Sequence, residues 1–531
     1  MKKILLTVFA ALMGFVFHHT VNAQQVDSLM AVYDEQFPKE KVHIHFDRTI
    51  YNKEETIFYK VYLQMASYPS EMSKNMYVAW FDTSGNLLKQ TAAPLFQSTA
   101  KGSFDIPANY KGDFIHVKAF TRWMLNEDSA FVFEKNIPIN SGKPTSSIQK
   151  IVLKSRVDLF PESGNLVQGV NNRIAFKATN QFGTPVLIKG FLVNDKNKVL
   201  DTIKAVHDGM GVFNLKPIAG EKYQLNWTDE LGQKGNTVLP QPKLQGVVLK
   251  LTADYEKAYA QVERTLDVPT NFKKFKLLVH QNQQLIYTVD FKGEEKLIQK
   301  AALPIYELPT GIVQFSLFTD DWKPIAERIV FVNNRLHEYN AKLSIPMIDL
   351  KKRGKNVIEI LVSDTASTNM SLSVTDASIV LPEQQSIYSD LLLSSDIKGK
   401  VHNPAYYFSS DADSVAAHLD LVMMTNGWRR FDWDKLINGD FPKWTYPRET
   451  DFLKLTGMVY GNQALANTKD LQLNLVISGK DSSSKLLFLP VAKDGSFEQT
   501  GVLFYDTVRV YYSFNNNPKL TEQTQVKISR I

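Results

Sequence analysis

The sequence contains no cysteine among its 531 residues. This absence excludes disulfide bonds, thiol chemistry and zinc sites built on cysteine ligands. An uncrosslinked chain must rest on ordinary hydrophobic cores, and a chain of this length is too long for a single core. We therefore expect several domains, each folded around a core of its own.

Long apolar runs are also lacking, apart from one at the start of the chain. Two lysines precede an apolar run over residues 4–17, and small residues follow up to Ala23. This pattern is typical of a secretory signal peptide, which we expect over residues 1–23. The run is short for a membrane span. We therefore predict an exported protein with no transmembrane span in its mature chain, located in the periplasm, associated with the outer membrane or on the cell surface.

Neither sign of charge dominates the chain. It has 61 basic and 55 acidic residues, and loss of the two leader lysines leaves 59 basic residues. Nucleic-acid binding needs cations concentrated on one face, because each phosphate contact needs its own cation. No such stripe is visible in the sequence, so we expect no nucleic-acid partner.

Common catalytic motifs are missing as well. The sequence has no GxSxG, no P-loop and no GxGxxG. These motifs mark nucleophilic serines and phosphate-binding loops. We therefore predict a protein that is not an enzyme, with no catalytic residue and no cofactor.

His43, His45 and Asp47 are spaced two apart in "KVHIHFDR" and raise the question of a metal site. Residues at this spacing share one face of a β-strand, and two imidazoles there could bind one metal ion. The alternative is the outward face of an ordinary strand. A metal site would still need a further ligand and an orienting second shell, and the other histidines after residue 23 occur singly. We favour the strand and predict no metal site.

Apolar residues alternate with polar ones along most of the chain, which is typical of half-buried strands. We predict a mainly β protein made of tandem immunoglobulin-like β-sandwich domains with a short helical insertion. A helix is expected over residues 24–40. The sandwiches are expected at 41–143, 150–243, 246–335, 338–447 (with the helical insertion at about 385–440) and 450–531.

A short pattern of glycine followed by alternating apolar residues recurs in several of these units. It occurs in "KGSFDIP", "DGMGVFNLKP" and "KDGSFEQ". We predict that Gly102, Gly211, Gly220 and Gly495 serve turns that require positive φ.

The helical insertion carries the best candidate for a partner contact. Residues 416–424 read as a buried helix that stops near Gly427. Five residues just after it form an aromatic and basic cluster: Trp428, Arg429, Arg430, Phe431 and Trp433. Such a cluster can form a binding patch. The alternative is that these residues pin the helix against neighbouring sandwiches.

Several stretches resemble an exported bacterial family of macroglobulin-like proteins. "EKVHIHFDRTIYNKEETIFYKVYL" resembles the opening of an MG2-type macroglobulin domain, except that Asn52–Glu55 replaces the turn glycine. "HDGMGVFNLKP", "LPTGIVQFSLFTDDWKPIAERIVFV" and "LDLVMMTNGWRRFDW" are similar to later landmarks of that family. The last 80 residues or so resemble a carboxypeptidase-regulatory-like domain, which has no peptidase activity.

The resemblance implies a binding or scaffolding role in the cell envelope, with an outer-membrane protein as partner. Relatives commonly continue into a domain like the plug of TonB-dependent receptors, which is not recognisable here, so a link to TonB-dependent transport is an expectation only. Two alternatives remain. One is a protease inhibitor without a thioester, with Val401–Ser414 as the bait, and the other is a glycan-binding surface protein. The sequence leaves the oligomeric state open.

Overall fold

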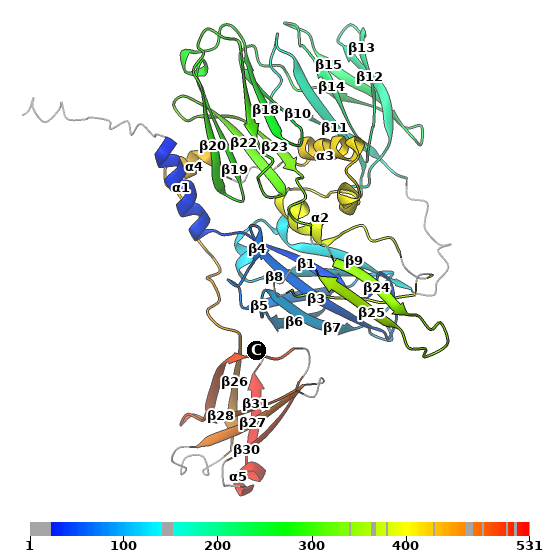
Figure 1. The fold of residues 1–531 in the computed structure, drawn as a ribbon, viewed down its shortest axis with the longest axis vertical. Coiled ribbons are helices and arrows are strands. Elements are labelled where there is room, and N and C mark those ends of the chain that lie inside the picture. Colours follow the sequence, from blue (N-terminus) through cyan, green and yellow to red (C-terminus); the bar gives the residue numbers. More distant parts are fainter. Residues whose placement is uncertain are drawn as a thin grey trace, which may run out of the picture.

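The computed structural model describes residues 23–140, 152–338, 341–362, 368–376, 378, 381–427, 431–461, 471–479, 483–505, 508–514 and 518–529. The expected signal peptide falls almost wholly on residues 1–22, outside the described residues. Within the described part, no helix combines the length and the apolar character that crossing a bilayer requires. The chain is mainly β, with α2 (Ile387–Leu392) and α3 (Asp413–Thr425) lying between the sandwiches and α5 (Pro518–Gln523) at the far end of the C-terminal unit (Figure 1).

The first sandwich has two sheets that share one core. One sheet has the order β1-β3-β4 with β7 beside β3, and the other has the order β2-β9-β8-β5-β6. The strands are β1 (Glu40–Phe46), β2 (Tyr51–Asn52), β3 (Thr56–Met65), β4 (Tyr68–Pro69), β5 (Asn75–Phe81), β6 (Leu87–Pro94), β7 (Thr99–Asp105), β8 (Phe114–Thr121) and β9 (Phe133–Asn140). Along β3, Ile57, Tyr59 and Val61 are buried and alternate with more exposed neighbours. The period-two pattern therefore predicted the inward face correctly.

The second and third sandwiches each pair a three-stranded with a four-stranded sheet. The second has the orders β10-β11-β14 and β13-β12-β15-β16, and the third has β17-β18-β21 and β20-β19-β22-β23. The strands of the second are β10 (Ser155–Pro161), β11 (Asn172–Asn180), β12 (Ile188–Asn194), β13 (Val199–Lys204), β14 (Met210–Leu215), β15 (Tyr223–Asp229) and β16 (Lys234–Val238). Those of the third are β17 (Val247–Ala253), β18 (Lys257–Arg264), β19 (Phe275–Gln281), β20 (Gln284–Phe291), β21 (Ile298–Pro304), β22 (Gly311–Thr319) and β23 (Pro324–Val332). Each sandwich has its own core, so each is a domain in the physical sense.

The structure corrects the expected sandwich at 338–447. The described residues of this range hold one two-stranded sheet, formed by β24 (Ala341–Met347) and β25 (Val357–Val362). All seven residues of β24 are exposed. A sandwich needs a second sheet against which one face is buried. Residues 368–376, which the expected sandwich included, lie against β1 and β3 of the first sandwich.

Helices occupy the space between the sandwiches. They are α1 (Ala23–Gln36), α2 (Ile387–Leu392), α3 (Asp413–Thr425) and α4 (Trp433–Ile437). Helix α2 contacts β1 of the first sandwich, α3 contacts β11 and β14 of the second and β23 of the third, and α4 contacts α1. Figure 1 shows α3 at the junction of the second and third sandwiches, with α2 below it above β1. The helical insertion therefore joins all three.

The C-terminal unit is a smaller sandwich of two three-stranded sheets, β29-β26-β31 and β28-β27-β30. Its elements are β26 (Leu453–Tyr460), β27 (Gln472–Gly479), β28 (Ser484–Pro490), β29 (Ser496–Val502), β30 (Val508–Phe514), α5 (Pro518–Gln523) and β31 (Gln525–Ser529). The linker before it meets the first sandwich through Glu449, which accepts hydrogen bonds from the Asn75 backbone N–H (3.0 Å) and the Tyr77 hydroxyl (2.9 Å). Tyr505 packs against the core of the first sandwich.

The recurring glycines have two different physical roles. Gly220 and Gly495 have φ of +78° and +88°, as predicted for turns. Gly102 and Gly211 do not adopt positive φ. Each lies directly opposite an aromatic residue in an antiparallel pair, Tyr59 and Phe176 respectively. A Cβ at Gly211 would lie 2.5 Å from the Phe176 ring, so glycine is required there because the ring lies over the bare backbone.

Candidate functional site

The outward face of β1 is covered by the helical insertion. His43 Nδ1 lies 2.7 Å from Asp390 Oδ2 of α2, 347 residues later in the chain, and both side chains are buried. Asp390 is positioned by the first turn of α2, where Ser386 and Ser389 form a reciprocal capping box. Burial raises the pKa of Asp390, and the nearby His43 offsets this only in part.

The other two residues of the opening motif have separate partners. His45 Nδ1 lies 2.6 Å from the Ser371 hydroxyl, which also accepts a hydrogen bond of 2.7 Å from Tyr62. Asp47 accepts a hydrogen bond of 2.6 Å from the Tyr51 hydroxyl. Burial lowers the pKa of His45. His43, His45 and Asp47 therefore bind three different parts of the protein and do not converge on one point.

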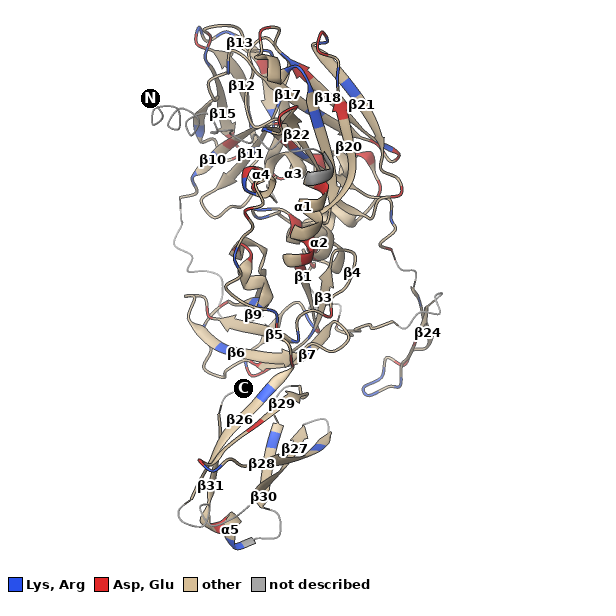
Figure 2. Cartoon of the chain, turned by 90° about the vertical axis from the view of Figure 1, so that its left-hand side faces the viewer, with Lys and Arg blue, Asp and Glu red and all other residues tan. Residues whose placement is uncertain are grey.

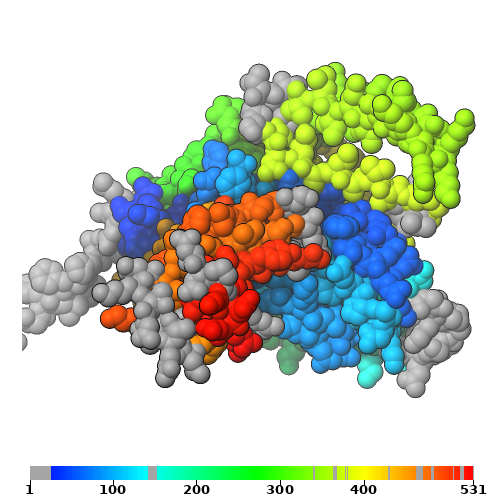
Figure 3. All heavy atoms as spheres, turned by 90° about the horizontal axis from the view of Figure 1, so that it is seen from below, coloured from blue at the N-terminus to red at the C-terminus, as the bar shows by residue number. Residues whose placement is uncertain are grey.

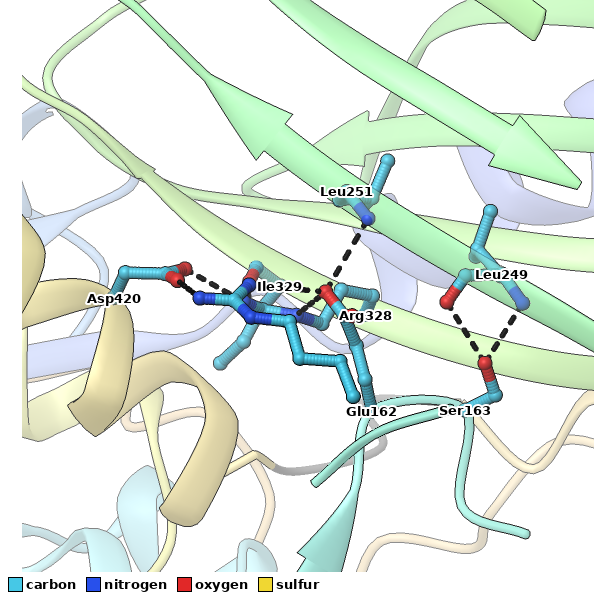
Figure 4. A network of polar contacts seen from close by, with 8 residues as sticks. Glu162, Ser163, Leu249, Leu251, Arg328, Ile329 and Asp420 are labelled. Carbon is cyan, nitrogen blue, oxygen red and sulfur yellow. Dashed lines mark hydrogen bonds and ion pairs between the residues drawn. The ribbon is translucent and has the colours of Figure 1, made fainter. Parts of the chain in front are cut away.

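A second polar centre joins the second sandwich, the third sandwich and α3 (Figure 4). Arg328 of β23 donates from Nε to Glu162 Oε1 (3.1 Å) and from Nη2 to Asp420 Oδ1 of α3 (2.5 Å). Arg173 of β11 donates to the other oxygen of Asp420 at 2.9 Å. Glu162 also accepts a backbone hydrogen bond from Leu251 of β17 at 3.3 Å.

Charge and burial make this centre a structural junction. Two guanidinium groups alternate with two carboxylates, so the cluster carries no net charge. Burial alone would raise the pKa of Asp420, but Arg328 and Arg173 outweigh that effect and hold the pKa below its ordinary value. Ion pairs removed from water are tolerated when every charge has a partner. The cluster fixes three elements to one another, and each guanidinium group in it is paired with both carboxylates.

The predicted contact patch after α3 is only partly described. Trp428, Arg429 and Arg430 lie outside the described residues. Phe431 and Trp433 are each only 3 % exposed. Trp433 Nε1 donates to Glu327 at 2.7 Å, and its ring meets Phe318 edge to face at 5.0 Å.

These two aromatic residues belong to a core cluster between α1, α4 and the third sandwich. Phe431 packs edge to face on Tyr33 of α1, with ring centroids 5.1 Å apart. Phe431 and Trp433 therefore pin the end of the insertion in place, as the alternative interpretation of the sequence proposed. Neither is presented to a partner at the surface.

A cluster of histidines and tyrosines lies where α3 meets the turn before β14. The rings of His207 and His418 are stacked with centroids 4.1 Å apart. His418 Nδ1 lies 2.8 Å from the Tyr406 hydroxyl, and His207 Nε2 lies 3.3 Å from Asp208 Oδ2. Burial lowers the pKa of His207, and His418 and His402 act in the same direction, against Asp208.

Large apolar side chains are exposed on the β24–β25 ribbon and on residues 368–376. On the ribbon, Leu343 is 60 % exposed, and Ile345, Met347 and Leu361 are exposed as well. Figure 3 shows the yellow-green ribbon arching away from the body with an open space beneath it. Monomeric proteins rarely leave so many large apolar side chains together in water, and such patches mark interaction sites.

Residues 368–376 also expose apolar side chains, because their polar side chains face the first sandwich. Asn369, Ser371 and Ser373 hydrogen-bond to the first sandwich. The intervening Met370, Leu372 and Val374 are exposed, Val374 to 75 %. The sequence predicted that the ribbon and this segment belong to a sandwich at 338–447. It did not reveal that their apolar side chains remain exposed.

Comparison of the sequence with models of known families and with curated proteins gives no match. Several solved structures are similar in fold. Escherichia coli alpha-2-macroglobulin activated by porcine elastase shares 10 % identity, with 90 % of this chain and 43 % of that chain covered and a TM-score of 0.22. Salmonella alpha-2-macroglobulin reacted with methylamine shares 8 % identity, with 92 % and 39 % covered and a TM-score of 0.17.

A tetra-tandem repeat from the extending region of a large adhesion protein shares 10 % identity, with 90 % of this chain and 99 % of that chain covered and a TM-score of 0.16. The chain spans less than half the length of the alpha-2-macroglobulins it matches. The sandwich architecture itself stands on the paired sheets and separate cores described above.

Proposed function

We propose that this chain is a non-catalytic binding protein of the cell envelope, of macroglobulin-like type, that docks a β-strand of a protein partner on the β24–β25 ribbon. The observation that carries the proposal is the exposed apolar surface of the ribbon and of residues 368–376. The three sandwiches and the helical insertion form the body that holds this surface in place.

The ribbon has the features of an incomplete sheet. In the described residues it has only two strands, so β24 and β25 each keep one edge without a strand partner. A two-stranded ribbon is marginal by itself in water, and a free edge is a template for a further strand. A strand from a partner would gain main-chain hydrogen bonds there and could bury alternate side chains against Leu343 and Ile360.

The protease-inhibitor alternative has less support. Its bait would be the stretch Val401–Ser414, but Val401 and Tyr407 are buried and only residues 409–414 are exposed. Asp411 in that exposed part also pairs with Arg335 (Nε to Oδ1, 2.9 Å). A bait that proteases cleave needs an exposed, adaptable backbone. The outer-membrane location and the link to TonB-dependent transport rest on the sequence resemblance, and a glycan-binding role has no specific support.

Single-cysteine crosslinking in the source cells tests the proposal cleanly, because the natural chain has no cysteine. A crosslinker on Leu343→Cys is expected to capture one envelope protein reproducibly. The matched control is Leu231→Cys, at an exposed leucine in a turn of the second sandwich. Hydrogen exchange with the purified partner should then protect amides of β24 or β25. Equal capture from both positions, or protection only elsewhere on the chain, contradicts the proposal.

A further inference from the structure

The turn that connects β24 to β25 carries a concentrated positive charge. Residues 348–356 read "IDLKKRGKN", with cations at Lys351, Lys352, Arg353 and Lys355 and one carboxylate at Asp349. All four cationic residues are exposed. Figure 2 shows the ribbon standing off from the body, with the turn at its end coloured for Lys and Arg.

The turn is held in shape by its own hydrogen bonds. Asp349 accepts from the Lys351 backbone N–H at 2.9 Å, and the Asn356 side chain donates to the Asp349 carbonyl at 3.3 Å. The Gly354 N–H donates to the Lys351 carbonyl at 2.8 Å. A Cβ at Gly354 would lie 2.5 Å from the Asp349 side chain. The one carboxylate therefore stabilises the turn, and the cations are presented from an ordered loop.

Two large apolar side chains lie beside these cations. Leu350 is 94 % exposed and Ile348 is 60 % exposed. Among the ion pairs of the described residues, none involves Lys351, Lys352, Arg353 or Lys355. A solvated loop has no need of an almost fully exposed leucine, and a site for a soluble acidic ligand would need only the cations.

We propose that this turn, residues 348–356, docks on the surface of an anionic lipid bilayer. The cations meet the lipid phosphates, and Leu350 and Ile348 enter the boundary between headgroups and acyl chains. An anionic bilayer places negative charge directly beside hydrocarbon, so it complements both features of the turn at once. An acidic protein surface would complement the charge and leave Leu350 in water.

The size of the effect follows from the charge count. A cation close to an anionic membrane surface strengthens binding by about fivefold, so removal of two cations should weaken binding by roughly 25-fold. The attraction is screened by salt, because the Debye length shrinks to about 3 Å at 1 M salt.

The lipid contact uses the turn, whereas the proposed strand docking uses the edges of β24 and β25. The two proposals therefore fail independently.

Vesicle binding by the mature chain, residues 24–531, tests the inference. Vesicles of phosphatidylcholine with about a third phosphatidylglycerol should bind the protein, and pure phosphatidylcholine vesicles should not. Lys351→Gln with Lys352→Gln should weaken binding by roughly 25-fold. Leu350→Asn keeps every charge, and it should weaken binding by about tenfold or more through loss of apolar burial.

The matched control is Lys196→Gln with Lys198→Gln, which removes two exposed lysines from a turn of the second sandwich. It should leave vesicle binding unchanged. Circular dichroism confirms that each variant is folded. A polarity-sensitive dye on Leu350→Cys should shift to the blue on anionic vesicles only.

Three outcomes would overturn the inference. The first is equal vesicle binding by the Lys351/Lys352 variant and the natural protein. The second is tight binding to soluble polyglutamate with the same variant dependence and no blue shift, which would make the turn a site for acidic protein. The third is full competition by millimolar glycerol phosphate, which would make it a site for free phosphate.

Discussion

Arg328 of β23 and Asp420 of α3 lie 2.5 Å apart (Nη2 to Oδ1), although 92 residues separate them in the chain. The contact joins the third sandwich to the helical insertion, and Glu162 on the other side of the same guanidinium joins both to the second sandwich. One buried side chain therefore holds three structural units in a fixed relation.

Replacing Arg328 with methionine should destabilise the protein strongly. Glu162 and Asp420 would keep only Arg173 as a counter-charge, and an uncompensated buried charge costs about 3–5 kcal/mol. The free energy of unfolding from urea titration measures the effect. Lys118→Met, which breaks the more exposed pair with Glu134, is the control and should cost about 0–1 kcal/mol. Equal costs would show that the centre is not a junction.

Loss of Asp390 should loosen the contact between α2 and β1. Asp390→Ala leaves His43 buried without its partner, at a cost of about 1–3 kcal/mol. Amide hydrogen exchange of Ile387–Leu392 should speed up. The control is Lys398→Ala. Lys398 lies in the same insertion and forms a more exposed ion pair with Asp128, so its loss should leave amide hydrogen exchange in α2 unchanged. Unchanged exchange in the Asp390 variant would contradict the role of this contact.

Stability should fall as the pH drops from about 7 to 5. Burial lowers the pKa of His207 from its ordinary value of 6.5, with His418 and His402 acting in the same direction and Asp208 against them. The unfolded chain then binds more protons than the folded one in this range, so acid favours unfolding. The midpoint of thermal unfolding should be lower at pH 5 than at pH 7. His207→Asn should reduce the difference, and an unchanged difference would contradict the assignment.

Adding a methyl group at Gly211 should be costly. Gly211→Ala places a Cβ 2.5 Å from the Phe176 ring, and overpacking of this kind costs about 1–3 kcal/mol. The control is Gly427→Ala, where the Cβ would meet nothing closer than the Met423 carbonyl oxygen at 3.7 Å. That change should stay within about 0.5 kcal/mol. Urea titration compares the two, and equal costs would contradict the ring-over-glycine arrangement.

Shortening one exposed side chain of the ribbon should leave the stability of the protein almost unchanged. Leu343→Ala removes an exposed side chain and should change the free energy of unfolding by at most about 0.5 kcal/mol. Leu249→Ala, at a fully buried position of β17, should cost about 2–5 kcal/mol. A large cost at Leu343 would mean that the ribbon is part of a core, and the proposed docking surface would be lost.

The fold class was predictable because a half-buried strand has apolar and polar residues that alternate in its own sequence. Alternation places Ile57, Tyr59 and Val61 on one face regardless of what that face meets, and the turn glycine Gly495 follows from backbone geometry alone. The glycine pattern also located Gly102 and Gly211. Their physical reason was missed, because the ring over each glycine belongs to a different strand.

The candidate sites were decided by contacts between distant segments. His43 is covered by α2, whose Asp390 lies 347 residues later in the chain. The alternation of residues along a strand cannot reveal which segment covers its outer face. Aromatic residues such as Phe431 and Trp433 are equally typical of a binding patch and of a core. Only the packing of α1 and α4 against the third sandwich places them in a core.

The sequence by itself determined which face of each strand is apolar, because that depends on the local backbone period. Only the tertiary structure decided which apolar faces are covered. The same alternation that builds a core in β3 leaves Leu343 and Val374 exposed in the ribbon and its neighbour. Burial depends on a second surface being present, and that surface is supplied by other parts of the chain or by a partner.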